Sequence, residues 1–152
     1  IYLSDTEEDV RKKVMSMFTD PNHLKVEDPG EVEGNPVFIY LEAFCRDDHF
    51  QRFWPEYENL DQLKAHYTRG GLGDVKVKKF LNQVLQDELA PIRARRKEYE
   101  KNIPEVYRIL QEGSQKARKV AARTLADVKA AMKIDYFEDE ELIQSQAQRF
   151  QA

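Results

Sequence analysis

The stretch Asp74–Asn102, DVKVKKFLNQVLQDELAPIRARRKEYEKN, decides the fold class of this chain. Its apolar residues recur every three or four positions, which places their side chains on one face of an α-helix; they are Val77, Phe80, Leu81, Val84, Leu85, Leu89 and Ile92. Asp74 suits an N-cap, whereas Pro91 lacks the amide hydrogen that a helix interior needs. The pattern therefore predicts a helix from Asp74 to about Asn102 with a kink at Pro91.

A second long helix is expected directly after the first. It starts near Pro104, runs past Met132 and is weakened in the middle by Gly113-Ser114. The residues expected to face a core again follow helical spacing: Tyr107, Leu110, Ala117, Val120, Ala121, Leu125, Val128 and Met132.

Shorter helices are expected upstream. Ser4 and Glu7 have the spacing of a capping box, which predicts a helix over residues 5–18. A Pro/Gly-rich loop is predicted over residues 19–36. Two short helices are predicted after it, over residues 37–44 and 59–67. Strand-like alternation is missing from the sequence. We therefore expect an all-α helical bundle with an irregular Pro/Gly-rich segment near its N-terminus.

The composition predicts a water-soluble protein. Charged residues make up 34% of the 152 residues, and mean hydropathy is -0.74. No apolar run approaches the roughly 20 residues that cross a bilayer, and the single cysteine, Cys45, excludes an intramolecular disulfide. We expect a cytoplasmic protein without membrane contact. Because the sequence begins at Ile1 without a signal peptide, we interpret it as a piece of a longer protein.

Charge is distributed unevenly along the chain. Residues 1–63 carry 6 basic and 15 acidic side chains, residues 64–135 carry 17 and 9, and residues 136–152 carry 1 and 4. The middle thus has a net charge of +8 within a chain of net charge -4. Because local charge sets the field that a polyanion feels, the basic middle favours nucleic acid as a partner. A solvated helical surface is the alternative interpretation.

Few residues suggest chemistry. His23, His49 and His66 lack the partners three or four positions away that helical zinc sites use, so we expect them at the surface or in an interface rather than at a metal. Cys45 is expected to be a small residue on an apolar helix face, and the acidic run 138–141 a solvated helix start. Catalytic residues and metal ligands are therefore not expected.

The glycines before Asp74 could suggest a phosphate loop. The sequence GGLG at residues 70–73 lacks the Gly-Lys-Ser/Thr ending that supplies the phosphate lysine. We interpret it as a helix stop and restart, although the N-terminus of the following helix could take one phosphate.

Two basic groups are the strongest functional candidates. One follows Pro91 and comprises Arg93, Arg95, Arg96, Lys97 and Lys101; the other comprises Lys116, Arg118, Lys119 and Arg123. Adjacent antiparallel helices would bring the groups into one patch that suits phosphates. Arg93 has a structural alternative, which is pairing with an internal carboxylate such as Asp87 or Glu88.

Four aromatic residues lie close together in the sequence: Phe50, Phe53, Trp54 and Tyr57. They could stack on bases, but packing between short helices is the expected use.

Three sets of segments resemble the bacterial tryptophanyl-tRNA synthetases of class I. They are IYLSD at residues 1–5 with VRKKVMSMFTDP at 10–21, DPGEVEGNPVF at 28–38, and GGLGD at 70–74 with APIRARR at 90–96. The resemblance extends to about Phe137 and covers the C-terminal helical portion of such an enzyme.

The resemblance implies a division into three parts. Residues 1–36 would connect to the catalytic domain, residues 37–135 would form a helical domain that binds the anticodon region of tryptophan tRNA, and residues 136–152 would form a tail. The family joins tryptophan to its tRNA with ATP and Mg²⁺ and is homodimeric, while this piece alone could be monomeric. The Lys-Met-Ser-Lys-Ser and His-Ile-Gly-His signatures do not occur in this sequence, so we expect neither catalysis nor cofactor binding from it.

The tRNA contacts expected from the resemblance and the charges are Arg93, Arg95, Arg96, Lys97, Lys116, Arg118, Lys119 and Arg123. The alternative is a structural helical module that buttresses the catalytic domain or a protein partner and has little affinity for tRNA.

Overall fold

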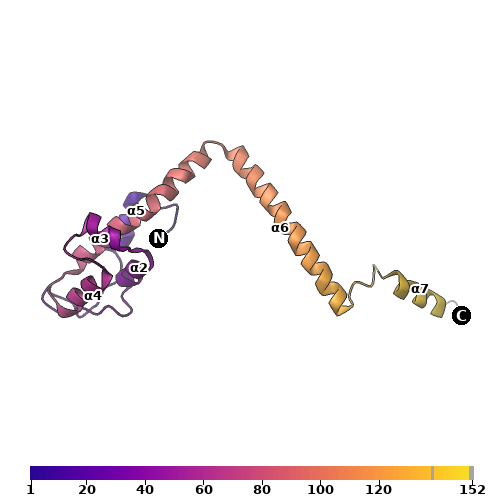
Figure 1. The fold of residues 1–152 in the computed structure, drawn as a ribbon, viewed down its shortest axis with the longest axis horizontal. Helices are drawn as coiled ribbons and strands as arrows, with labels where there is room; N and C mark the ends of the chain where they lie inside the picture. The colour runs from indigo at the N-terminus through magenta and orange to yellow at the C-terminus, as the bar shows by residue number, and fades with distance from the viewer. Residues whose placement is uncertain (138, 151–152) are drawn as a thin grey trace. The chain divides into compact units, whose positions relative to one another are not determined.

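The computed structural model describes residues 1–137 and 139–150. Within these ranges it contains helices and no strand, which confirms the predicted all-α class (Figure 1). The helices are α1 Glu7–Met15, α2 Pro36–Phe44, α3 Asp47–Phe53, α4 Leu60–Arg69, α5 Asp74–Glu100, α6 Ile103–Met132 and α7 Glu140–Arg149. They belong to two compact units, Ile1–Glu98 and Tyr99–Ala152.

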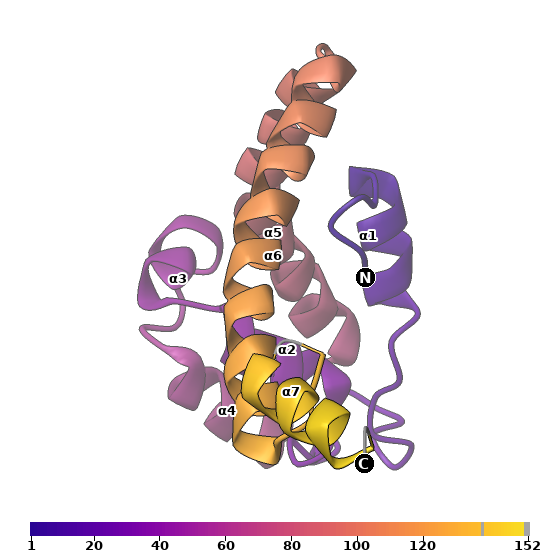
Figure 2. The same cartoon turned by 90° about the vertical axis from the view of Figure 1, so that its right-hand side faces the viewer.

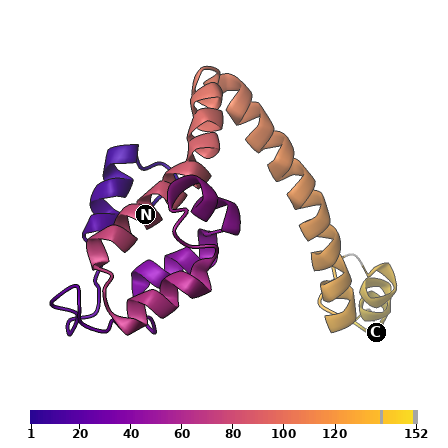
Figure 3. The same cartoon turned by 60° about the vertical axis from the view of Figure 1, so that its left-hand side comes forward.

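The first unit packs α1 to α4 against the N-terminal part of α5 (Figure 3). Six members of the apolar stripe predicted on α5 are confirmed as the centre of this core, because Val77, Phe80, Leu81, Val84, Leu85 and Leu89 are all buried. The prediction is wrong for Ile92, which is exposed because it lies past the end of the packed helices. Each fully buried Leu or Phe side chain contributes about 1.5–3 kcal/mol relative to exposure. The helix continues through Pro91 and ends at Glu100, so its extent agrees with the prediction within two residues. The kink at Pro91 stays a prediction.

α1 is shorter than the helix predicted over residues 5–18. Its capping box uses Thr6 and Asp9 instead of Ser4 and Glu7, with the Asp9 amide donating to Thr6 Oγ1 at 3.1 Å. Asp5 is unavailable for the helix because its carboxylate accepts from the Tyr2 amide at 2.8 Å and from Lys13 Nζ at 2.6 Å. The residues before Thr6 therefore form a turn ahead of the helix.

The far end of α1 is closed by a buried lysine. Lys78 on α5 donates from Nζ to the carbonyl oxygens of Met15 and Met17, at 3.3 and 2.7 Å. A helix leaves its last carbonyls without partners inside the helix, and this ammonium group satisfies that of Met15, the last helical residue, together with the Met17 carbonyl just beyond it. The helix consequently stops at Met15, and Phe18 lies exposed beyond it.

The aromatic residues near α3 are core residues. Phe50 packs against Phe80 with 4.7 Å between ring centroids, and Trp54 packs against Phe80 at 5.4 Å and against Tyr57 at 5.0 Å. The expected packing between short helices is thereby confirmed. The short helix α3 itself carries no clear periodic pattern in the sequence.

The Pro/Gly-rich loop between α1 and α2 is fastened to α4 and α5. The buried Tyr67 donates its hydroxyl to Asp74 Oδ1 at 2.6 Å, and His23 Nδ1 lies 2.9 Å from the same oxygen. The loop amide of Gly30 donates to the Tyr67 carbonyl at 3.0 Å. Burial and the Asp74 carboxylate raise the pKa of Tyr67, so the phenol stays protonated and keeps its donor. These contacts order a long loop that has few apolar residues of its own.

α6 is an unbroken helix (Figure 2), yet the prediction that its apolar stripe faces a core is wrong for the structure described here. None of its residues is buried, and Tyr107 and Val120 are 70% and 69% exposed. α7, which begins after the N-cap Asp139, has no buried residue either, so the described residues of the second unit form no core of their own. The run 138–141 does mark a helix start, but Glu138 lies outside the described residues.

Candidate nucleic-acid interface

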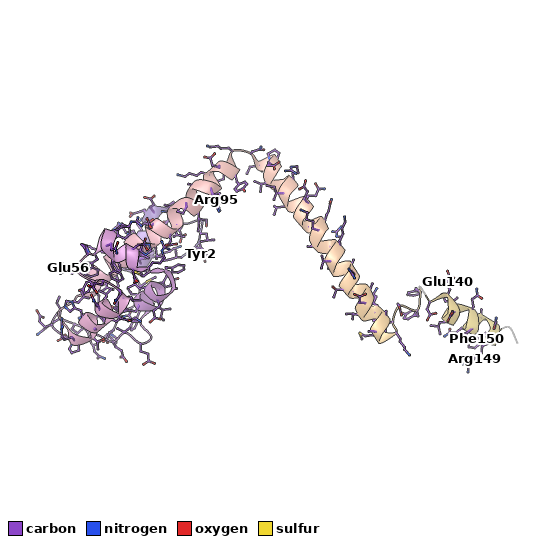
Figure 4. The ribbon with its side chains drawn as sticks, viewed as in Figure 1. Tyr2, Glu56, Arg95, Glu140, Arg149 and Phe150 are labelled. Atoms are coloured by element: carbon purple, nitrogen blue, oxygen red, sulfur yellow. The ribbon has the colours of Figure 1, made fainter. Side chains whose placement is uncertain are left out.

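The basic residues after Pro91 lie on the part of α5 that extends past the packed helices. Figure 4 labels Arg95 there, and Arg95, Arg96 and Lys97 are all exposed. Arg96 and Lys101 each take part in a further interaction. Three cations in successive positions thus surround this stretch of the helix.

Arg93 differs from these neighbours because its side chain is largely buried. Its Nη2 donates to Gln86 Oε1 at 2.8 Å and lies 3.6 Å from Glu7 Oε1. The alternative of pairing with an internal carboxylate is therefore confirmed, but the partner is Glu7 of α1 rather than Asp87 or Glu88. Arg93 Nη1 is buried without a hydrogen-bond partner. The geometry shows Arg93 holding α1 against α5, and its assignment as a tRNA contact stays a prediction.

The basic residues of α6 divide between two faces of the helix. Lys116, Lys119 and Arg123 are spaced by three and four positions, so they fall within about 60° of one another around the axis. Arg118 lies on the other side of the helix. All four side chains are exposed.

Glu105 and Glu112, on the N-terminal side of this basic face, are already paired, whereas Asp127, four positions after Arg123, forms no ion pair with it. Arg108 binds Glu105 through Nη2 at 2.5 Å and also binds Glu112. Glu112 is four positions before Lys116, the spacing at which a glutamate supports a lysine best, but Arg108 occupies it. Across the described part of the chain, no carboxylate forms an ion pair with Lys116, Lys119 or Arg123.

One cluster has the residue types of a metal site. His49, Asp87 and Glu88 place their possible ligand atoms within 4.8 Å of one another. Each of the three residues already has a hydrogen-bond partner, however. His49 Nδ1 accepts from the Arg46 amide at 3.0 Å, Arg52 binds Asp87 through two nitrogens, and Arg46 binds Glu88. Arg52 thereby lowers the pKa of Asp87 to about 2. We interpret the cluster as an ion-pair network that joins α3 to α5.

The expectation that all three histidines lie at a surface or interface is wrong for two of them. His23 and His49 are buried, and each contacts carboxylates that are distant in sequence. His66 is half-buried, with its Nδ1 at 2.7 Å from the Tyr57 hydroxyl. A histidine pattern could not reveal this, since the partners come from other helices.

The buried Lys78 was also missed, although a signal for it exists. Lys78 precedes Leu81 by three positions and Leu85 by seven, which places it on the apolar stripe of α5. A lysine at such a position is rarely buried without partners, and here two carbonyls provide them.

Two other candidate sites have structural roles. Asp74 stands at the start of α5, where its carboxylate already supplies the negative charge that a phosphate would bring. Cys45 caps the end of α2, and burial together with Asp47 and Asp48 raises the pKa of its thiol to about 12. A thiol with that pKa is a poor nucleophile at neutral pH.

Comparison with known proteins explains the combination of a helical core and basic helices. Over 137 residues the sequence is 62% identical to the tryptophan–tRNA ligase of Clostridium longisporum, 59% identical to that of Streptococcus pyogenes serotype M3 and 53% identical to that of Streptococcus agalactiae serotype V. The chain matches one part of the tryptophan–tRNA ligases. The match includes 90% of this chain but 38% of the length of each relative.

Solved structures support the same fold. The tryptophanyl-tRNA synthetase of Campylobacter jejuni aligns with a TM-score of 0.61 and 22% identity, over 88% of this chain and 39% of that one. A second structure of that enzyme, complexed with ADP and tryptophan, aligns with a TM-score of 0.62. At this identity the likeness concerns the fold alone. No protein-family model matches the chain.

A membrane-spanning helix must be both long and apolar. None of the described helices combines the length and the hydrophobicity of a membrane span.

Proposed function

We propose that this chain binds tryptophan tRNA through the basic groups on α5 and α6, as the anticodon-region domain of a ligase that attaches tryptophan to its tRNA with ATP. The observation that carries the proposal is the exposed set Lys116, Lys119 and Arg123 on one face of α6, without carboxylate partners among the described residues. The similarity to tryptophan–tRNA ligases supports tRNA as the polyanion that binds these cations.

The groups have separate expected roles. Arg95, Arg96 and Lys97 crowd positive charge onto the last turns of α5, and arginine can bind phosphates or base edges through its planar fork. Arg93 has little freedom to join them, because Gln86 and Glu7 hold its guanidinium. We therefore expect Arg93→Ala to reduce stability more than tRNA affinity.

The buttressing alternative keeps one supporting observation. Phe50 and Tyr57 are not available for such protein contacts, since both side chains are buried in the core of the first unit. The exposed apolar stripe of α6 remains as a surface that could contact protein. Protein contact and tRNA binding are compatible, because they use different faces of α6.

Filter binding of the chain to tryptophan tRNA tests the proposal. Affinity should fall steeply between low and moderate salt, and the Arg95→Ala plus Lys119→Ala variant should bind more weakly. A Lys25→Ala plus Lys76→Ala variant removes the same charge from exposed positions on the first unit and should bind nearly as wild type does. Salt-independent binding, or equal loss in both double variants, would contradict the site assignment.

A tRNA with a changed anticodon separates base contact from backbone contact. If the domain reads anticodon bases, this tRNA should bind more weakly than tryptophan tRNA at the same salt concentration. Equal affinities would leave contacts to the RNA backbone only.

A further inference from the structure

We propose that α6 binds consecutive phosphates of a single RNA strand through Lys116, Lys119 and Arg123, and that Arg118 takes no part in this contact. The inference deepens the proposed function and rests on it. It assigns to α6 a positioning contact that carries no sequence information.

The exclusion of Arg118 from the contact follows from helical geometry. Five exposed apolar residues of α6 share one side of the axis and form its stripe: Tyr107, Leu110, Leu125, Val128 and Met132. Val120, predicted to belong to the stripe, lies between this side and the basic face. At about 100° per residue, Lys116, Lys119 and Arg123 centre on the opposite side, roughly 170° away. Arg118 falls within about 60° of the centre of the stripe. An RNA strand that contacts the basic face would therefore not contact Arg118.

The three cations of the basic face form no ion pair with a described residue. Lys119 follows Lys116 by three positions and precedes Arg123 by four, and like charges at these spacings destabilise a helix by roughly 0.2–0.5 kcal/mol per pair. Arg108, on the same helix, avoids such repulsion because it forms ion pairs with Glu105 and Glu112. A sequence that places three like charges together without such partners gains from an anion bound between them.

The spacing selects the kind of anion. From residue 116 to residue 123 a helix rises about 10 Å. One strand of a stacked nucleic acid presents roughly three phosphates over that length. Two of the three cations are lysines, which act as point charges rather than as bidentate forks, so the arrangement suits backbone more than base edges. Three phosphates neutralised on a single strand contribute about -2 to the slope of log affinity against log salt.

Lys119→Ala and Arg118→Ala form a matched pair for the test. Each removes one positive charge from adjacent exposed positions of the same helix, and alanine favours the helix in both cases. The measurement is filter binding of each variant to tryptophan tRNA and to poly(U) across a range of salt concentrations. Circular dichroism checks that both variants keep wild-type helicity.

The inference predicts different outcomes for the pair. Lys119→Ala should weaken binding to both RNAs about fivefold and make the salt slope shallower by about 0.7. Arg118→Ala should stay within about twofold of wild type. The Lys116→Ala plus Lys119→Ala plus Arg123→Ala variant should lose a slope of about 2 for both RNAs.

Three results would overturn the inference. Equal losses in the two single variants would show an effect of net charge alone. A loss for tryptophan tRNA without a loss for poly(U) would show that α6 reads bases or shape. No loss in the triple variant, while wild type still binds tRNA, would place the contact elsewhere and leave the proposed function standing. A wild-type chain that binds poly(U) but not tryptophan tRNA would instead refute the proposed function.

Discussion

Gly30 shows how a single residue fastens the loop to the core. Its amide donates to the carbonyl of Tyr67, and a Cβ atom placed on it would lie 2.3 Å from Tyr67 Cε1. Tyr67 cannot retreat easily, because it is buried, packs against Phe38 at 4.8 Å and donates its hydroxyl to Asp74. The glycine is required here by close approach of the backbone to an aromatic ring.

Replacement of Gly30 by alanine should therefore destabilise the first unit by about 1–3 kcal/mol, the usual cost of overpacking. The measurement is urea unfolding followed by the fluorescence of Trp54, the sole tryptophan, which packs in the same core. A Gly30→Ala variant with wild-type stability would show that Tyr67 and the loop move aside without cost.

The Arg52–Asp87 pair should make the free energy of unfolding depend on pH in the acidic range. Arg52 holds the pKa of Asp87 at about 2, below the ordinary value near 3.9 for an unfolded chain. Because the folded pKa is the lower one, the contribution of the pair is complete above about pH 4–5 and is lost as pH falls toward 2.

The test compares Asp87→Asn with wild type by urea unfolding at several pH values. The variant should be less stable at pH 7, and the difference should shrink as pH falls from 5 to 2. A difference that stays constant with pH would mean that the Asp87 charge does not contribute.

At the level of elements, α5 and α6 contrast although both are long amphipathic helices. The stripe of α5 is covered by four shorter helices, whereas no described residue of α6 is buried. Packing therefore stabilises α5, and local propensity decides the stability of α6. Gly113 lies near the middle of α6, and a Cβ atom added to it would have no other atom within 4 Å.

Gly113→Ala should raise the helicity of α6, since alanine is favoured over glycine by up to about 1 kcal/mol in a helix interior. Far-ultraviolet circular dichroism at rising temperature measures the change. Trp54 fluorescence serves as the control, because it reports the first unit and should melt as in wild type. A shift of both signals would indicate that the two units unfold together.

For the whole molecule, the uneven burial predicts two stages of unfolding. The first unit has a core that joins α1 to α5, while the second unit has no buried residue among those described. Helices without tertiary packing lose structure gradually and at low denaturant concentration. Circular dichroism should therefore decline before Trp54 fluorescence changes. Coincident transitions would contradict this expectation.

Hydrogen exchange of α6 provides a second test for the whole molecule. The chain matches 38% of the length of its relatives, so a longer ligase could cover the apolar stripe of α6. Hydrogen exchange of α6 amides should be fast in this chain. Slow exchange in the chain alone would show that its own residues already protect the helix.

The sequence by itself determined the helical class and the positions of most helices, because periodic apolar spacing and caps act within a few residues. It also located the two basic groups and, through the resemblance, the ligases that the chain matches. Tertiary structure decided what those helices touch. His23 meets Asp74 across 51 positions, and Arg93 on α5 meets Glu7 on α1. Such partners depend on how helices pack, which local periodicity does not encode. For the same reason the stripe of α6 correctly predicted a helix but not a core.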